Sequence, residues 1–134
     1  MLDISAMLGT FDEDLAPEVM AGLIVAWVEA LAKTNLVYLQ LFPDTIALYD
    51  SDVYYKMERV GEEDFFDIPT VLEQGYADCE DLAAWRIAEY WFEGYYAAPL
   101  VTWTEYDNGD IEFHVQVNTS FGVEDPSLVK GMAA

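Results

Sequence analysis

The sequence predicts an α+β domain with N-terminal helices and a central, cysteine-bearing helix packed on a small antiparallel sheet. Two patterns carry this prediction. Apolar residues recur at helical spacing over residues 15–34 and again over 79–93. From Leu100 to Asn118, polar and apolar residues alternate on either side of a strong turn signal. Helices that come first and an antiparallel sheet that follows are typical of this fold class.

The first helix is expected over residues 15–34. Pro17 suits a first helical turn, and Glu18 suits the positive end of the helix dipole. Thr34-Asn35 is expected to end the helix, after which 36–42 either extends the helical region or forms a second short helix. The apolar stripe that predicts the helix consists of Met20, Leu23, Ile24, Trp27 and Leu31. We expect Trp27 on this face to lie in the core, and the alternative is a ligand platform.

The next segment carries weaker patterns. Residues 44–70 are acidic and rich in tyrosine, and we expect them to be irregular. Within them, 64–69 is interpreted as a loop anchored by Phe65 and Phe66.

A short helical turn over 70–74 is expected to stop at Gly75. The segment 79–93 then shows overlapping apolar stripes, which predict a central, largely buried helix that ends at Gly94.

The C-terminal third changes to a strand pattern. Residues 100–106 and 111–118 alternate, and the turn sequence Asp107-Asn108-Gly109-Asp110 between them predicts a β-hairpin. A second turn over 119–122 leads into a short strand that ends at Asp125-Pro126.

The chain of 134 residues is most simply one domain over 1–134, with 1–14 as a flexible N-terminal arm. Its 26 acidic and 5 basic residues give a formal net charge of −21. Such a surface repels nucleic acid and anionic lipid, because phosphate binding depends on clustered Lys and Arg. The acidity either favours basic or neutral partners, or serves solubility or a high-salt setting.

Nothing in the sequence predicts secretion or a membrane partner. The single cysteine cannot form an internal disulfide, and the N-terminus lacks the basic and apolar regions of a signal peptide. The longest apolar run, Val19 to Val28, is shorter than the ~20 residues that span a bilayer. We therefore expect a soluble, intracellular protein.

Cys79 is the only cysteine and stands where a polar, glycine-bearing turn runs into the 79–93 helix. A helix N-terminus directs free amides at the sulfur and favours the nucleophilic thiolate. Asp78, Glu80 and Asp81 oppose this, because nearby like charge disfavours the thiolate. An active thiol therefore needs these carboxylates to point elsewhere, into capping bonds with helix amides. The alternative is an inert buried thiol.

His114 is the only histidine and lies in the second strand of the expected hairpin. Its polar face suits an imidazole that reaches a nucleophile, and the alternative is an ordinary exposed strand histidine. Alternation gives this polar face Glu112, Gln116 and Asn118. The opposite, apolar face consists of Ile111, Phe113, Val115 and Val117.

A thiol at a helix N-terminus, a strand imidazole and a downstream carboxylate are the components of a Cys-His-Asp nucleophilic site. Asp125 supplies the carboxylate, and Pro126 biases it towards extended backbone. Since the chain has one cysteine and one histidine, any thiol–imidazole mechanism uses Cys79 and His114.

The stretch Gly-Tyr-Ala-Asp-Cys-Glu-Asp-Leu-Ala-Ala-Trp-Arg, from Gly75 to Arg86, resembles the nucleophile motif of transglutaminase-like cysteine proteins, specifically a small phage- or prophage-encoded branch. In that branch a Gly-x-Gly-Asp-Cys-Glu-Asp-Leu-Ala motif precedes a strand His-Val and a terminal Asp-Pro-Ser and Gly-Met. This chain carries His114-Val115, Asp125-Pro126-Ser127 and Gly131-Met132 in that order. With similar segments at 43–49 and 67–70, the resemblance covers most of 36–132.

The resemblance implies a transglutaminase-like or papain-like fold, with Cys79 as nucleophile, His114 as general base and acid, and Asp125 as the orienting carboxylate. Ala77 stands where the family pattern usually has glycine, and is expected to tighten the turn beside the thiol.

The implied activity is thiol-based acyl transfer on amide bonds of a protein or peptide substrate. Water as acceptor would make the protein a peptidase or amidase, and an amine would make it a crosslinking enzyme. The implied location is the host cytoplasm or the virion. The alternative is a non-catalytic structural or assembly protein of a phage particle, which keeps the fold and binds phage structural proteins.

An oxyanion hole needs hydrogen-bond donors, and the candidates are the Cys79 amide and Gln74, five residues upstream. For Gln74 the alternative is a plain surface glutamine. We expect no cofactor and no dedicated metal site. Zinc usually takes several Cys or His ligands, and the acidic turn at 107–110 is better interpreted as a hairpin than as a calcium loop.

Overall fold

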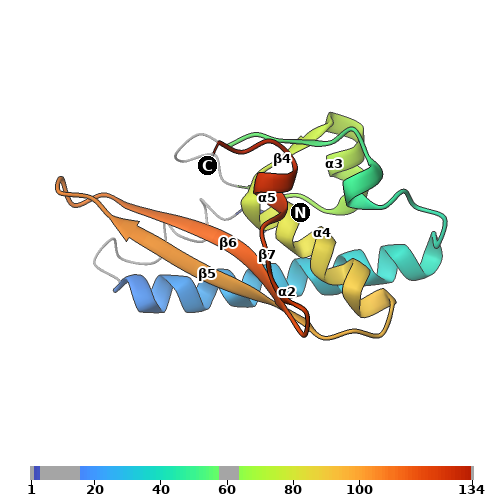
Figure 1. The fold of residues 1–134 in the computed structure, drawn as a ribbon, viewed down its shortest axis with the longest axis horizontal. Helices are drawn as coiled ribbons and strands as arrows, with labels where there is room; N and C mark the ends of the chain where they lie inside the picture. Colours follow the sequence, from blue (N-terminus) through green and yellow to red (C-terminus); the bar gives the residue numbers. More distant parts are fainter. Residues whose placement is uncertain (1, 4–15, 58–63, 134) are drawn as a thin grey trace.

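The apolar stripe of the N-terminal region forms one long helix, α2 (Pro17–Leu41), in the computed structural model, which describes residues 2–3, 16–57 and 64–133 (Figure 1). Trp27 is buried in the core, as predicted. The prediction that Thr34-Asn35 ends the helix is wrong. The alternative, that the following residues extend it, is confirmed.

A long-range hydrogen bond explains why the helix continues through Asn35. The side chain is fully buried, and its Oδ1 accepts a hydrogen bond from the Ile68 amide at 2.9 Å. Asparagine has a weak helix propensity, which a tertiary contact of this kind readily overrides.

Helix α2, with 25 residues, is long and apolar enough to cross a membrane. The prediction that the apolar run Val19 to Val28 is too short to span a bilayer therefore does not apply to the whole helix. A core helix passes the same test of length and composition. Here Ile24, Val28 and Leu31 belong to the main hydrophobic core, and α2 packs against α4 (Cys79–Phe92) and β5 (Ala97–Glu105).

The segment predicted to be irregular contains short ordered elements. They are η1 (Leu48–Asp50), β2 (Tyr54–Tyr55), β3 (Asp64–Phe65), α3 (Ile68–Gln74) and β4 (Tyr76–Ala77). Strand β3 pairs antiparallel with β1 (Leu2–Asp3), and the rest of the expected N-terminal arm lies outside the described residues.

Helix α3 begins two residues earlier than the sequence predicted. The Asp67 side chain caps it by accepting hydrogen bonds from the amide and the hydroxyl of Thr70. It ends at Gly75, as predicted, with φ at +87°, a left-handed conformation that glycine adopts without steric cost.

Ala77, which stands where the family pattern usually has glycine, does not strain the backbone. Ala77 pairs with Tyr55 in the parallel β2–β4 bridge, is buried, and has no positive φ. Glycine's conformational freedom is therefore not required at this position.

The C-terminal sheet matches its prediction. Strands β5 and β6 (Ile111–Thr119) form the antiparallel hairpin, and β7 (Gly122–Glu124) pairs with the end of β6. A four-residue helix, α5 (Pro126–Val129), follows and was not predicted. Because β7 pairs only with positions 117–119, the first part of β6 pairs with β5 alone among the described strands.

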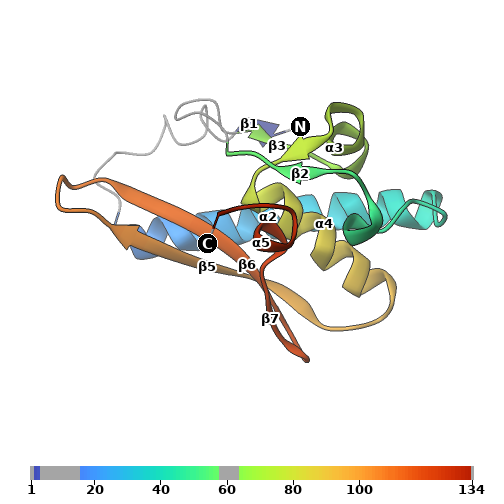
Figure 2. The same ribbon diagram turned by 45° about the horizontal axis from the view of Figure 1, so that its top comes forward.

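Helices α2 and α4 pack against each other and against the β5–β6 hairpin, while α3 and the short strands gather on the opposite side from β7 (Figure 2). The predicted central helix is confirmed as α4, which contacts both β5 and β6. The fold is thus mixed α and β, with helices and a small antiparallel sheet.

Candidate active site

Cys79 is the first residue of α4, and a capping box fixes the start of this helix. Asp78 is the N-cap, and its Oδ1 accepts a hydrogen bond from the Cys79 amide at 2.7 Å. Asp81 accepts from the amides of Asp78 and Phe66 at 3.2 and 2.8 Å. The prediction that these carboxylates enter capping bonds is confirmed for Asp78 and Asp81. Since the Cys79 amide already donates to Asp78, it is occupied and does not point to an oxyanion.

Glu80 departs from that prediction. Its Oε2 lies 3.3 Å from Cys79 Sγ and accepts the thiol hydrogen. Both side chains are buried, with 7% of Cys79 and 8% of Glu80 exposed. Burial, followed by the charges of Glu80 and Asp78, raises the pKa of the Cys79 thiol well above its ordinary value. The thiol is therefore neutral at pH 7 in this conformation.

One contact favours the thiolate. The backbone of Val115 forms a hydrogen bond with the Cys79 sulfur, which lowers its pKa but does not outweigh burial and the carboxylates. Val115 belongs to the part of β6 that pairs only with β5 among the described strands. It is one residue along the strand from His114.

His114 and Asp125 meet as predicted. His114 Nε2 lies 2.7 Å from Asp125 Oδ2, and the two side chains are 27% and 11% exposed. Asp125 is also the N-cap of α5, where its Oδ1 accepts a hydrogen bond from the Leu128 amide. This fixes the carboxylate at the end of the β7 connection and beside the imidazole.

Gln116 is a further member of this group that the sequence indicated only as a face-mate of His114. Its Nε2 donates to the same Asp125 oxygen at 3.2 Å. The two side chains are two residues apart on β6 and so point to one face of the strand. Asp125 Oδ2 is thus held from two sides.

The structure thus assembles the three predicted residues to different degrees. His114 and Asp125 are in direct contact, and Cys79 contacts the neighbouring backbone of Val115. Within the described residues, the hydrogen-bond partners of the sulfur are Glu80 and Val115, and the imidazole is not one of them.

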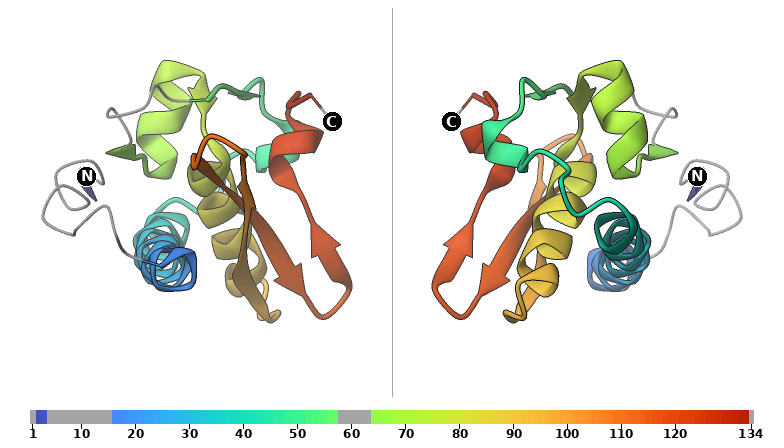
Figure 3. Two further views of the ribbon diagram at one scale, coloured as in Figure 1. Left: turned by 90° about the vertical axis from the view of Figure 1, so that its left-hand side faces the viewer. Right: turned by 90° about the vertical axis from the view of Figure 1, so that its right-hand side faces the viewer.

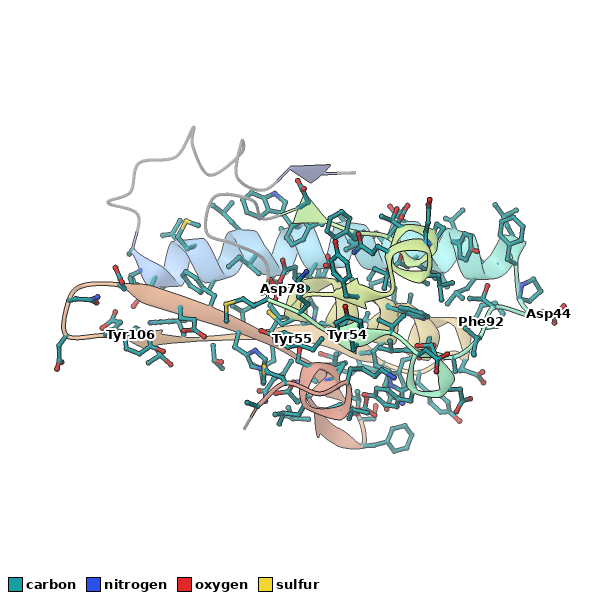
Figure 4. All side chains as sticks on the ribbon, turned by 90° about the horizontal axis from the view of Figure 1, so that it is seen from above. Asp44, Tyr54, Tyr55, Asp78, Phe92 and Tyr106 are labelled. Atoms are coloured by element: carbon teal, nitrogen blue, oxygen red, sulfur yellow. The ribbon has the colours of Figure 1, made fainter. Side chains whose placement is uncertain are left out.

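Tyr55 lies close to the thiol, and sequence reasoning missed it. Burial, followed by the charges of Asp78, Cys79, Glu80 and Glu112, raises the pKa of its phenol. The parallel pairing of β2 with β4 brings Tyr55 beside Ala77, two residues before Cys79 (Figure 4). No local pattern in the sequence predicts a parallel bridge between two-residue strands.

Gln74, the proposed oxyanion donor, lies at the C-terminal end of α3. Its Nε2 donates to the Tyr76 carbonyl at 2.7 Å, which holds the turn between α3 and β4. Within the described part of the chain, this bond occupies one of its two amide hydrogens. The oxyanion assignment of Gln74 stays a prediction.

Asp78, Cys79 and Glu80 place one ligand atom each within 4.8 Å of one another, the spacing of a possible metal site. The set fits zinc poorly, because structural zinc sites take four ligands, mostly Cys and His. Asp78 is also engaged with the Cys79 amide, and Glu80 with the thiol. The absence of a metal or cofactor stays a prediction.

Comparisons with protein-family models, with curated proteins and with solved structures find no match for this chain.

Proposed function

We propose that this protein is a cysteine enzyme of the transglutaminase-like type that transfers acyl groups from amide bonds, with Cys79, His114 and Asp125 as its catalytic triad. The contact of 2.7 Å between His114 and Asp125 carries the proposal. A carboxylate in this position orients an imidazole and stabilises its protonated form. The position of Cys79 at a helix start, beside the strand that carries His114, supports the same assignment.

The hydrogen bond to Asp125 decides which ring nitrogen of His114 acts. Nε2 is engaged by the carboxylate, so Nδ1 is the atom that takes the thiol proton. Because the resting thiol is neutral, His114 removes this proton as the sulfur attacks the carbonyl, and no thiolate–imidazolium pair forms beforehand.

The reaction then follows two balanced steps. The sulfur bonds to the carbonyl carbon, the C–N bond breaks, and the amine leaves with the proton from His114, so a thioester remains on Cys79. In the second step His114 takes a proton from water or from an amine, which attacks the thioester carbon. The C–S bond breaks, and His114 returns the proton to the sulfur of Cys79. Water gives a peptidase or amidase, and an amine gives a crosslinking enzyme.

The partner proposed for this activity is a protein or peptide substrate in the host cytoplasm or at the virion. Nucleic acid and membranes are not proposed as partners, since 26 acidic residues against 5 basic ones repel phosphate groups.

The second candidate is a structural or assembly protein of a phage particle that keeps the fold without catalysis. A specific observation favours it: the thiol is buried and hydrogen-bonded to Glu80, as an inert cysteine would be.

Acylation by p-nitrophenyl acetate separates the two candidates. We expect the intact folded chain to gain one acetyl group on Cys79 at pH 7.5, detected by mass spectrometry of the tryptic peptide, with release of p-nitrophenolate. His114→Ala should slow acylation about 100-fold, the usual contribution of a general base. Asn118→Ala, an exposed change on the same strand, is the matched control and should keep the wild-type rate.

If the folded protein shows neither acetylation of Cys79 nor release of p-nitrophenolate that depends on Cys79, the enzyme assignment fails and the structural one is favoured. The same holds if His114→Ala reacts as fast as the wild type. For an acylated enzyme, added glycine ethyl ester distinguishes transfer from hydrolysis, since only transfer yields the acetylated amine.

A further inference from the structure

The end of α4 that lies away from Cys79 carries an exposed aromatic surface beside an open pocket. The pocket has a volume of about 320 Å³ and lies between residues 39–47 and the C-terminal half of α4. Its lining includes Pro43, Glu89, Tyr90, Phe92, Glu93 and Tyr95. Since α4 has 14 residues that each rise ~1.5 Å, this surface is roughly 20 Å from the candidate active site.

Two segments that are distant in sequence bring their rings together here. Figure 3 (right) shows that the C-terminal end of α4 and the β6–β7 turn lie at the same end of the molecule. Tyr90 lies on α4, Tyr95 follows its end, and Phe121 lies in the β6–β7 turn. The ring centroids of Tyr95 and Phe121 are 5.4 Å apart, and each is 6.5 Å from Tyr90. Tyr95 is 50% and Phe121 71% exposed. We call Tyr90, Phe92, Tyr95 and Phe121 the aromatic end.

The structure already holds one guanidinium at the aromatic end, and this shows what chemistry suits it. Arg86 lies over the rings of Tyr49 and Tyr90, at 4.6 and 4.4 Å from their centroids. It also pairs with Glu124 at 2.8 Å and Glu89 at 3.1 Å. Aromatic faces combined with carboxylates are the usual environment of a bound arginine.

Negative charge remains around this surface after Arg86 is paired. Arg86 pairs with the two carboxylates of Glu89 and Glu124, and a third acidic residue, Glu93, lines the same pocket as Glu89. Glu93 and Asp44 are exposed at this end of the molecule, where Figure 4 shows Asp44 near Phe92.

We propose that the aromatic end is a docking surface for an arginine-bearing segment of a partner protein. A guanidinium of the partner would stack on Tyr95 and Phe121 and pair with Glu93, as Arg86 does within the chain with Tyr90 and Glu89. Charge complementarity selects this occupant: with a net charge of −21, a second copy of the chain would be repelled, as would an anionic lipid surface. The proposal does not depend on the activity of Cys79.

The test is a ¹H–¹⁵N correlation titration of the full chain with acetyl-Gly-Arg-Gly-Arg-Gly-amide at low salt. We expect shifts concentrated in residues 39–47, 89–96 and 119–123. The double variant Tyr95→Ala, Phe121→Ala should bind at least about fivefold more weakly, because it loses two stacking contacts. Tyr106→Ala is the matched control, since Tyr106 is 48% exposed and lies at the opposite end of the molecule (Figure 4), and should bind as the wild type does.

Several results would overturn the proposal. One is a set of shifts spread over the whole acidic surface, and another is an equal loss of binding in Tyr106→Ala. Equal binding of a peptide with glutamine in place of both arginines would show that the surface is merely apolar. Shifts that depend on protein concentration without peptide would identify a second copy as the occupant. The spectra of the variants themselves report whether they remain folded.

Discussion

The two halves of helix α4 carry carboxylates that contact different groups, a guanidinium in one and a thiol in the other. In the C-terminal half of α4, Glu89 on the helix and Glu124 on β7 surround a guanidinium, Arg86, which donates hydrogen bonds to both. At the N-terminal end, Asp78 and Glu80 surround the Cys79 thiol, which becomes an anion when it titrates. Similar side chains therefore stabilise a charge at one end of the helix and oppose one at the other.

The pKa values express this difference. Burial raises the pKa of Glu124, but hydrogen bonds from Arg86 and Tyr90 and the Arg86 charge outweigh it and lower the pKa below its ordinary value of 4.5. At Cys79, burial and the two carboxylates act in the same direction and raise the pKa of the thiol. Arg86 thus lowers the pKa of Glu124, although burial still raises the pKa of its other partner, Glu89. At the other end of α4 the carboxylates suppress formation of the Cys79 thiolate.

The largest expected effect comes from removing the cation. Arg86→Met leaves Glu124 and Glu89 without the cation that pairs with them, and we expect the free energy of unfolding to fall by about 2–3 kcal/mol at pH 7, somewhat less than for a fully buried pair. Urea denaturation measures this. Lys33→Met removes the same charge from an exposed site on α2 and should change the free energy by less than about 0.5 kcal/mol.

The pH dependence of this loss sharpens the comparison. Because the folded-state pKa of Glu124 is lowered, the stabilisation is fully present above its ordinary pKa of 4.5 and is lost as pH falls through the folded value. The difference between wild type and Arg86→Met should therefore shrink in acid. A difference that is equally large at pH 7 and pH 3 would mean that Arg86 stabilises through packing on Tyr49 and Tyr90.

At the other end of α4, the matching change is Glu80→Gln. It removes the carboxylate nearest to the sulfur, so we expect the pKa of the Cys79 thiol to fall, and each unit of that fall means about tenfold faster alkylation below the pKa. The pH profile of iodoacetamide alkylation measures this in the folded protein.

Glu112→Gln is the control for this prediction. Glu112 is exposed on β6 and bonds to the Tyr106 hydroxyl at 3.0 Å, so its removal takes away a charge on the same strand that carries His114 without touching the sulfur. If both variants shift the profile equally, the general field of the acidic surface controls the thiol. If neither does, burial and the charge of Asp78 set the pKa of the thiol.

Local patterns predicted the parts of the fold that depend on local contacts. The helical period gave α4 its limits within one residue, and the turn Asp107-Asn108-Gly109-Asp110 joins β5 to β6 as expected. The end of α2 was misplaced, because Asn35 is held in the helix by Ile68, 33 residues further along the chain. No propensity at Thr34-Asn35 contains that information.

The candidate site likewise has features that the sequence predicted and features that only the folded structure reveals. The pair of His114 and Asp125 was predicted from motif order, and the capping role of Asp78 and Asp81 from their position at a helix start. The direction of the Glu80 side chain was not predicted, because a side chain in a first helical turn can point to solvent or back to its neighbour. Tyr55 was missed since a two-residue parallel bridge positions it.

The smallest expected effect comes from Gln116→Ala, which tests whether Asp125 needs its second side-chain partner. The loss of one hydrogen bond of 3.2 Å to a charged oxygen should lower the free energy of unfolding by about 1 kcal/mol, measured by urea denaturation. Acylation of Cys79 by p-nitrophenyl acetate should slow by only a few fold, because His114 keeps its own contact with the carboxylate. Asn118→Ala, exposed on the same strand, should change neither quantity. A loss of acylation as large as that in His114→Ala would mean that Gln116 holds Asp125 in place, and that the imidazole alone does not.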